Sequence, residues 1–473
     1  MKRVLTLALV GALVLGLAGF ASAKEVQMKA QFNHFLTWTD NTDFDDSDRE
    51  DDFKADQRIR VYFDYVASES LNAVLGFEIN SEWGNESEGG DLGTDGNTVA
   101  VKHAYTNFVV PGTSVSARVG LQPVGFKGAY GSPIFDDDAA GILVSSPITD
   151  QVGLTVGWVR ALDNADGEDD SKYNEDDIDI FTAILPVNMD GFGFTPYLIY
   201  GSLGADIYNA YSLNTDGGAW SAGETRMLDL DDKHFYAKGL VSSNPKLSGV
   251  DDNSSLFWGG LNFEVTMFDP FTVKGDIIYG SVNADDEEND RSGWFMDLGV
   301  EYAMDFGTLG VMGIYGSGDD DDENDGSETM PTLNDSGFGP THFGFSGAQT
   351  GGTDSVLAGG DRYDLWAIGA YLADFSFVED LSHKLIVVYG QGTTDGELVK
   401  DSGTTYTLKG STPAITDEDS FWEVNFDSTY QIYENLACIA ELGYINLDRD
   451  DDVWGDENDD DALKAAFYLK YDF

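Results

Sequence analysis

The amino-acid sequence predicts an all-β protein, a transmembrane antiparallel β-barrel of about 16 to 18 strands. Three observations support this fold class. The chain begins with an export-type segment, its apolar residues alternate with polar ones in short stretches, and short links alternate with long ones. The first observation indicates the compartment, the second the strands, and the third the closure of the sheet.

The amino terminus has the pattern of a secretory signal peptide. Two basic residues precede an uncharged, largely apolar run at 4–20, which ends on small residues up to Ala23. Small residues at this place are typical of a cleavage site. A charged pair beginning at Lys24 follows at once, so a cleaved signal fits better than a permanent anchor. We therefore expect a signal peptide at 1–23 and one barrel domain at 24–473.

Composition excludes several other classes of protein. The formal net charge of −59 makes nucleic acid an implausible partner. Such an acidic chain would be disordered if aromatic residues were scarce, but they make up 13% of this one and recur in short regular segments. A single cysteine, Cys438, cannot form an internal disulfide. Beyond Phe20 no apolar stretch approaches the roughly twenty residues of a transmembrane helix.

The alternation is clearest at 292–304. There the apolar face carries Trp294, Met296, Leu298, Val300 and Tyr302, and the opposite face carries Asp297, Gly299 and Glu301. The same layout recurs at 271–279 and 422–430, with an aromatic residue at each end of the apolar face. Eight residues of tilted strand climb about 20 Å, close to the height of a lipid-facing band with aromatic girdles. A soluble β-sandwich with aromatic ends is the alternative.

The links between these segments alternate strictly in length. Short links fall at 67–70, 111–114, 149–151, 189–191, 268–270, 305–307, 374–381 and 432–435, and long ones at 40–55, 84–97, 123–139, 163–176, 203–255, 283–291, 318–361, 392–418 and 448–461. Membrane barrels need short turns on one side and longer loops on the other. The links divide the chain into about eighteen strands, although about sixteen also suit this length. Either even number closes the sheet without an edge.

The carboxyl terminus continues the pattern and carries a family resemblance. One face of the last strand holds Ala465, Phe467, Leu469, Tyr471 and Phe473, and the other holds Lys464, Tyr468, Lys470 and Asp472. A final Phe473 after alternating apolar residues looks like the assembly signal of bacterial outer-membrane proteins. That resemblance implies recognition by the barrel-assembly machinery and a place among the lipids of a Gram-negative outer membrane.

The whole chain, with an early long loop followed by acidic residues, resembles the trimeric general porins. The similarity is greatest to the abundant porin of sulfate-reducing, Desulfovibrio-type bacteria. It implies a homotrimer of open pores, a water-filled channel for passive diffusion of small hydrophilic solutes and ions, and a loop at 122–139 that folds back to constrict the pore.

Charged residues on the predicted lumen faces suggest how such a pore would act. Alternation turns Arg58, Arg60, Lys102 and Arg118 inward, while the link at 123–139 carries Asp136, Asp137 and Asp138. We expect a basic wall and an acidic loop to face each other across the constriction. Opposed charges in a narrow opening orient polar solutes. The alternative for each residue is a solvated lumen charge with no special role.

Three polar residues fall on predicted outer faces. They are His34 in the first strand and His103 and Asn107 in the fourth, where Val99, Val101, Tyr105 and Val109 define the apolar face. A polar side chain that faces hydrocarbon without a partner costs several kcal/mol. We therefore expect these residues to lie in a trimer interface. A position near the lipid headgroups is the alternative for the two histidines.

The acidic loops suggest no defined cofactor. Asp321, Glu323, Asp325 and Gly326 approach the spacing of a calcium-binding loop, but Thr332 stands where a bidentate glutamate would close it. We expect at most weak association of calcium or magnesium with the acidic loops.

Two further classes of function remain to be weighed. The five histidines are scattered and neither a metalloprotease nor a hydrolase motif occurs, so we expect no enzyme, although distant strands could still assemble a hydrolase site. A channel specific for a sugar or an anion is the stronger rival. The predicted lumen faces are mostly polar, which favours a general pore, but a folded loop could contribute aromatic residues such as Phe126, Tyr130 and Phe135.

Overall fold

The computed structural model describes most of the chain from residue 25 to 473. The ranges outside the description are 1–24, 45–48, 88, 94–97, 164–176, 205–252, 285–286, 288–289, 323–324, 334–337, 348–355, 358–362, 402–414 and 455–459. The expected signal peptide at 1–23 therefore lies outside the described residues.

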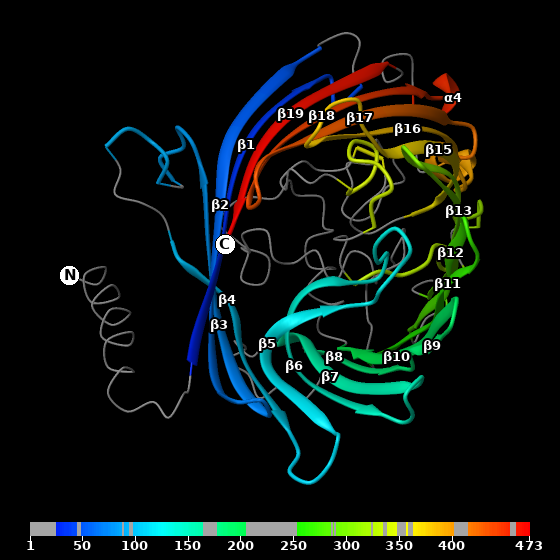
Figure 1. Ribbon diagram of the computed structural model, residues 1–473. Helices are drawn as coiled ribbons and strands as arrows, with labels where there is room; N and C mark the ends of the chain where they lie inside the picture. Colours follow the sequence, from blue (N-terminus) through cyan, green and yellow to red (C-terminus); the bar gives the residue numbers. More distant parts are fainter. Residues whose placement is uncertain are drawn as a thin grey trace.

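The described residues form one antiparallel sheet that curls into a barrel (Figure 1). Its strands are β1 (Glu25–Asp40), β2 (Asp51–Ser68), β3 (Leu71–Glu82), β4 (Ala100–Val109), β5 (Ser116–Gly125), β6 (Asp136–Pro147), β7 (Gly153–Asp163), β8 (Asp177–Ile184), β9 (Val187–Met189), β10 (Phe192–Leu203), β11 (Ser254–Phe268), β12 (Phe271–Asn283), β13 (Arg291–Met304), β14 (Gly307–Gly316), β15 (Leu365–Phe375), β16 (Leu381–Gly392), β17 (Ser420–Tyr433), β18 (Leu436–Asp448) and β19 (Asp461–Asp472).

β8 and β9 are two parts of one crossing of the barrel wall. Both pair with β10, and only Leu185 and Pro186 separate them. A proline has no amide to give to the ladder, so the strand is interrupted there. The barrel therefore has 18 crossing strands, which decides between the two numbers that the sequence allowed.

Helices contribute little to the described part of the chain. It contains the short helices α3 (Gly396–Asp401) and α4 (Asp451–Trp454), both in links between strands. No helix among the described residues is long and apolar enough to cross a membrane.

The barrel closes where its first and last strands meet. β1 pairs with β2 on one side and with β19 on the other. At the end of this seam the Ala30 amide donates to the Phe473 carbonyl at 2.9 Å, and the Phe473 amide donates to the Ala30 carbonyl at 3.0 Å. Closure leaves the sheet without a free first or last strand, as a bilayer requires.

The predicted alternation of short and long links is confirmed. Each of the eight short links joins neighbouring strands at one end of the barrel, and each of the nine long links joins them at the other. Two strands begin earlier than expected, since β2 starts at Asp51 and β6 at Asp136. Both extensions are paired with a neighbouring strand, because hydrogen bonding continues beyond the apolar band into the links.

The predicted lipid-facing residues lie on the outer wall. In β13, Trp294, Met296, Leu298 and Tyr302 are exposed, whereas Asp297 and Gly299 are buried. Aromatic rings of adjacent strands meet at both ends of this band. The ring centroids of Tyr279 and Trp294 lie 5.0 Å apart, and those of Phe271 and Tyr302 lie 4.9 Å apart. Such pairs form the girdles expected at the two interfaces of a membrane.

The interior is less polar than the sequence analysis expected. A buried apolar cluster unites inward side chains of the wall, including Ile180, Ile199, Trp258 and Phe295, with Phe126, Ile134 and Phe135 of the β5–β6 link and Phe338, Phe343 and Phe345 of the β14–β15 link. The expectation of mostly polar lumen faces is therefore wrong for this part of the wall. Two links fold back into the barrel and give these apolar side chains partners.

Candidate pore constriction

The hairpin formed by β5 and β6 leaves the wall and leans into the barrel (Figure 1). Its pairing with β4 ends at Leu121, but its two strands stay paired as far as Gly125 and Asp136. Gly120, just before the departure, has a φ of 126°, and a Cβ there would lie 2.2 Å from the Ala104 carbonyl oxygen. Only glycine fits this backbone. It therefore permits the bend that carries the hairpin inward.

The tip of this hairpin reaches the far wall. The Ala129 amide donates to Asp276 Oδ2 of β12 at 2.6 Å. The Tyr130 ring centroid lies 4.9 Å from Lys274 Nζ, also on β12, in a cation–π contact. The hairpin thus crosses the lumen from β5 and β6 to β12.

A pair of buried acids lies beneath the tip. Asp276 and Asp297 stand opposite each other on β12 and β13 and are 1% and 4% exposed. Asp276 Oδ1 accepts a hydrogen bond from Asn262 at 3.0 Å. Alternation placed both acids on lumen faces, but only the position of the tip reveals that Asp276 anchors it.

The described parts of the link between β14 and β15 also lie inside the barrel. Arg291, fully buried, donates to the carbonyl oxygens of Thr329 and Met330, each at 3.2 Å. Farther along the link, the Thr341 hydroxyl donates to Glu423 of β17 at 2.8 Å. This second inward link was not predicted from the sequence, because its polar and glycine-rich composition is that of an ordinary surface loop.

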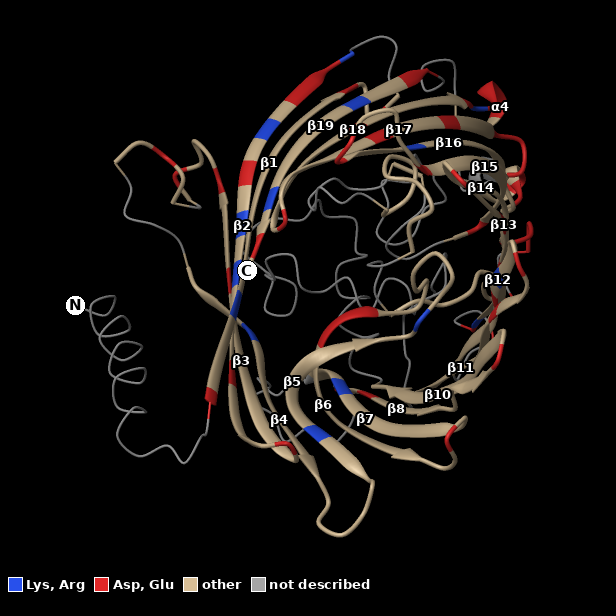
Figure 2. Cartoon of the chain, in the orientation of Figure 1, with Lys and Arg blue, Asp and Glu red and all other residues tan. Residues whose placement is uncertain are grey.

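One accessible part of the lumen wall lies along β2. None of the eighteen residues of β2 is fully buried, on either its outer face or its inner, lumen-facing side. Arg58 and Arg60 share the inner face with Tyr62, as alternation predicted. Figure 2 shows basic residues along this strand and the acidic start of β6 nearer the middle of the ring.

Lys102 owes its orientation to a β-bulge. Gly76 of β3 pairs with His103, but the next residue, Phe77, pairs with Val101, so Lys102 is an extra residue. A bulge of this kind lets two successive side chains point the same way. Lys102 Nζ lies 2.6 Å from Asp138 Oδ2 and His103 Nε2 lies 2.8 Å from Asp138 Oδ1. Both residues therefore join the inward hairpin to the wall.

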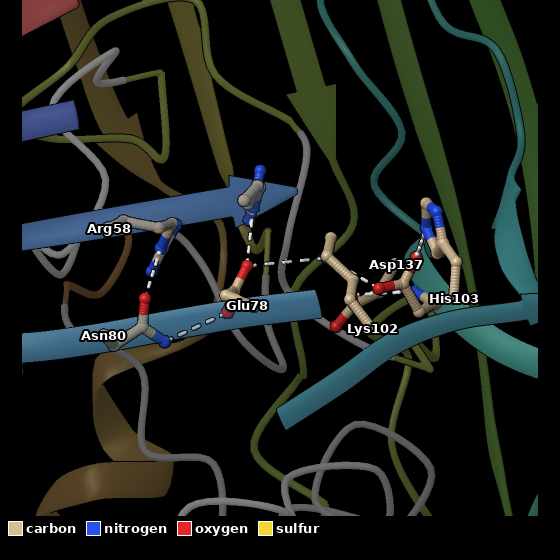
Figure 3. A network of polar contacts seen from close by, with 8 residues as sticks. Arg58, Glu78, Asn80, Lys102, His103 and Asp137 are labelled. Atoms are coloured by element: carbon tan, nitrogen blue, oxygen red, sulfur yellow. Dashed lines mark hydrogen bonds and ion pairs between the residues drawn. The ribbon is translucent and has the colours of Figure 1, made fainter. Parts of the chain in front are cut away.

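A row of polar contacts continues from this junction along the wall (Figure 3). Glu78 Oε2 lies 3.9 Å from Lys102 Nζ and 2.5 Å from Arg60 Nε. Arg58 Nε donates to Asn80 Oδ1 at 3.0 Å, and Asn80 in turn donates to Glu78. We call Arg58, Arg60 and Lys102 the basic strip.

The structure brings together only part of the predicted constriction set. Lys102 meets Asp138 directly, whereas Arg60 pairs with Glu78 and Arg58 contacts Asn80. Asp136, Asp137 and Asp138 begin strand β6 and pair with β5, so they belong to the hairpin's ladder and not to a free loop.

Arg118 lies apart from the basic strip, near the short turns. Its Nε donates to Asn107 Oδ1 at 2.8 Å, and its guanidinium carbon lies 5.0 Å from the centroid of the Tyr105 ring. It borders a cavity of about 330 Å³. The lining residues are Glu69, Ser70, Asn72, Asn107, Phe108, Val109, Ser116, Ala117, Arg118, Leu143, Ser145 and Thr155.

His103 and Asn107 do not have the outward orientation that alternation predicted. His103 is 9% exposed and contacts Asp138, and Asn107 accepts from the lumen-facing Arg118. The bulge at Lys102 reverses the alternation along β4. Val101, before the bulge, points outward, whereas the odd-numbered His103 and Asn107, after it, point inward. Of the three polar residues predicted on the outer wall, only His34 lies there, opposite Leu469 of β19 and beside the ring of Trp83.

The acidic link after β14 gathers three carboxylates. Oxygens of Asp320, Asp325 and Glu328 lie within 4.8 Å of one another. Burial raises the pKa of Glu328, and neighbouring acids raise it further. Glu323 of the near-motif lies outside the described residues, and Thr332, where a closing glutamate would stand, is fully buried. Like charges this close together repel one another, so the cluster by itself does not establish a metal site.

Comparison with known proteins identifies the fold. No family model matches the chain, and no curated protein matches it. Among solved structures, OccK8 (OprE) of Pseudomonas aeruginosa has a TM-score of 0.52 at 11% identity, over 96% of this chain and 99% of that one. OccK3 (OpdO) of the same organism has a TM-score of 0.51 at 11% identity, over 95% and 96%. A double variant of OccD1 (OprD) has a TM-score of 0.52 at 10% identity, over 95% and 96%.

These similarities extend over nearly the whole of each chain. The protein therefore has the closed antiparallel 18-strand barrel fold of outer-membrane porins.

The Lys102–Asp138 contact can be tested as the interaction that holds the β5–β6 hairpin to the barrel wall. Asp138→Asn should loosen the hairpin and increase the open-channel noise of single channels in a planar bilayer. The exposed fractions of 18% and 16% place the ion pair between surface and interior, so its loss should cost about 1 kcal/mol. The exchanged pair, Lys102→Asp with Asp138→Lys, should restore quiet channels. Equal noise in all three proteins would show that this contact does not hold the hairpin.

Proposed function

We propose that the chain is an outer-membrane porin, a water-filled channel through which small hydrophilic solutes and ions diffuse passively. One observation carries the proposal. The lumen-facing side chains of β2 remain accessible although a hairpin crosses the barrel beside them. A closed wall with an accessible polar strip provides a hydrated path, whereas a packed interior along every strand would not.

The hairpin and the basic strip together form the constriction in this proposal. Lys102 and Asp138 bring opposite charges to the point where the hairpin meets the wall. Among the described residues, no carboxylate lies within 4.0 Å of a nitrogen of Arg58, so Arg58 forms no direct ion pair, although Glu78 is near enough to interact with its charge. A field across a narrow opening orients polar solutes and penalises apolar ones, because the effective dielectric constant is below that of bulk water.

A channel specific for anions is the second candidate. Two inward links packed by apolar side chains narrow the barrel, and the guanidiniums of Arg58 and Arg118 each donate to an asparagine instead of a carboxylate. In a general pore, added solutes would reduce the conductance only according to their size. A specific channel would show competition between solutes of one chemical class.

The proposed setting is the outer membrane of a Gram-negative bacterium, with export directed by the signal peptide at 1–23 and insertion assisted by recognition of Phe473. The outer wall supports this setting, because its apolar band is bordered by paired aromatic rings at both ends. We propose a transport role without catalysis.

Ion selectivity tests the role of the basic strip. The net charge of −59 favours cations weakly at low salt, and this preference should fade as the screening length falls below about 8 Å. Arg58→Gln should raise the ratio of cation to anion permeability by about two- to fourfold, since a unit charge about 10 Å away in water changes an ion's energy by roughly 0.4 kcal/mol. Reversal potentials across a salt gradient measure this ratio.

The control removes a charge together with its partner. The double variant Arg60→Gln with Glu78→Gln leaves the local net charge unchanged and should leave the reversal potential close to that of the wild type. Strong anion selectivity of the wild type at low salt would contradict the expected weak cation preference, and an equal shift in both variants would contradict the proposed role of Arg58.

We further propose a homotrimer that is closed through the outer wall of β1 to β3. His34 and Gln57 face outward there on paired positions, and Trp83 donates to Gln57 at 3.4 Å. The described part of the link after β3 lies outside the ring (Figure 1). Polar groups that face lipid are costly, so a neighbouring subunit would cover them. Native mass measurement in mild detergent should give the mass of three chains, and stable conducting monomers would contradict this assembly.

A further inference from the structure

Two wall side chains hold a stretch of the β14–β15 link at residues 329–333. Arg291 of β13 donates to two successive carbonyl oxygens of this stretch, each at 3.2 Å. The indole Nε1 of Trp258 on β11 donates to the next carbonyl oxygen, that of Pro331, at 2.8 Å. Both side chains are fully buried. A buried carbonyl that loses its donor keeps the cost of its desolvation, so these bonds fix the path of the backbone here.

The wall holds a second stretch of the link, at residues 338–343, by the same kind of contact. The carboxylate of Glu423 on β17 accepts from the Thr341 hydroxyl at 2.8 Å and from a backbone amide of the stretch at 3.2 Å. Lys464 of β19 donates to the His342 carbonyl at 2.8 Å. Glu423 and Lys464 are buried as well. We call residues 329–333 and 338–343 the anchored stretches.

Each anchored stretch donates one backbone hydrogen bond to the β5–β6 hairpin. The Leu333 amide donates to the Ile134 carbonyl, and the Gly339 amide donates to the Tyr130 carbonyl, both at 2.9 Å. Leu333 and Ile134 also belong to the same buried apolar cluster. The hairpin tip therefore has partners in the wall at β12 and in both anchored stretches.

The side chains that hold the anchored stretches do not face the accessible lumen. Trp258 and Glu423 are both fully buried, so a solute in the channel does not touch them. Each lies only a few residues of link away from a bond to the hairpin, because Pro331 is near Leu333 and Thr341 is near Gly339. Any effect of these two side chains on conduction must therefore pass through the link.

We propose that the anchored stretches position the constriction hairpin, and that Trp258 and Glu423 are positioning residues for conduction that act through it. Loss of one anchor lets the tip leave the place where it narrows the lumen, although the wall contact at Asp276 is unchanged. This inference rests on the proposed channel function, since it names residues that set the opening of that channel.

The test removes one hydrogen bond at each anchor and keeps the shape of the side chain. Trp258→Phe removes the donor to Pro331, and Thr341→Val removes the hydroxyl that donates to Glu423. In single-channel recordings of the full chain in planar bilayers, each variant should spend about five- to thirtyfold more of its open time in a wider conductance level. Hydrogen exchange of the amides at 126–134 should become faster by a similar factor.

A shortened hairpin separates positioning from a direct effect of the link on the opening. In a protein whose residues 127–134 are replaced with a short glycine–serine linker, the tip has no bond to either anchored stretch. Trp258→Phe and Thr341→Val should then leave the conductance unchanged, because effects that act through one element are not additive. Effects as large as those with the full hairpin would show that the link narrows the channel by itself, and would contradict the proposal.

The matched control is Trp422→Phe. It removes the same indole donor from Asn446 on the outer wall, where the bond is 3.2 Å long, and should leave both conductance and hydrogen exchange at the wild-type values. Heat-modifiable migration on gels checks that each variant forms a barrel. The positioning role is overturned if Trp258→Phe behaves like the wild type in both measurements, or if Trp422→Phe changes them equally. A wild type that carries no current would contradict the proposed channel function, while hydrogen exchange would still decide whether the anchored stretches hold the hairpin.

Discussion

The structure depends on the requirement that every backbone amide and carbonyl in a bilayer has a partner within the protein. An open sheet cannot meet this requirement, so β1 must find β19 across the whole length of the chain. Closure accounts for the even number of crossing strands and for the hydrogen bonds between Ala30 of the first strand and Phe473 after the last. It also gives the barrel an outer wall, which carries the apolar band. Closure also creates an enclosed lumen, and the wall residues that face it are free to vary in chemistry.

Two inward links decide what becomes of that lumen. The β5–β6 hairpin and the β14–β15 link pack apolar side chains against the wall from β7 onward, where residues such as Trp258 and Phe295 are fully buried. The wall at β2 has no such cover and keeps its polar side chains accessible. In the proposed channel, this unequal packing would place the hydrated path on the β2 side of the barrel. Lys102 and Asp138 stand at the boundary, because they join the hairpin to the accessible wall.

Periodicity and link lengths predicted the barrel, the inward and outward faces of its strands, and the even number of strands, because these features depend on neighbouring residues in the chain. The candidate site was predicted in part: alternation turned Arg58, Arg60 and Arg118 inward, but it could not show that Glu78 neutralises one arginine. His103 was misplaced because a one-residue bulge at Lys102 reverses the faces, and no local pattern marks that insertion. The second inward link escaped because its contacts, such as Thr341 with Glu423, join residues far apart in sequence.

The central claim is that the inward hairpin sets the opening of a channel whose wall closes without it. Replacing residues 127–134 with a short glycine–serine linker removes the tip and its contact with Asp276, but retains the pairing of β5 with β6 up to Gly125 and Asp136. The single-channel conductance of the shortened protein is the most direct measurement. The account predicts a stable, heat-modifiable barrel with a larger conductance that also admits larger neutral solutes. An unchanged conductance with unchanged solute size limit would contradict it.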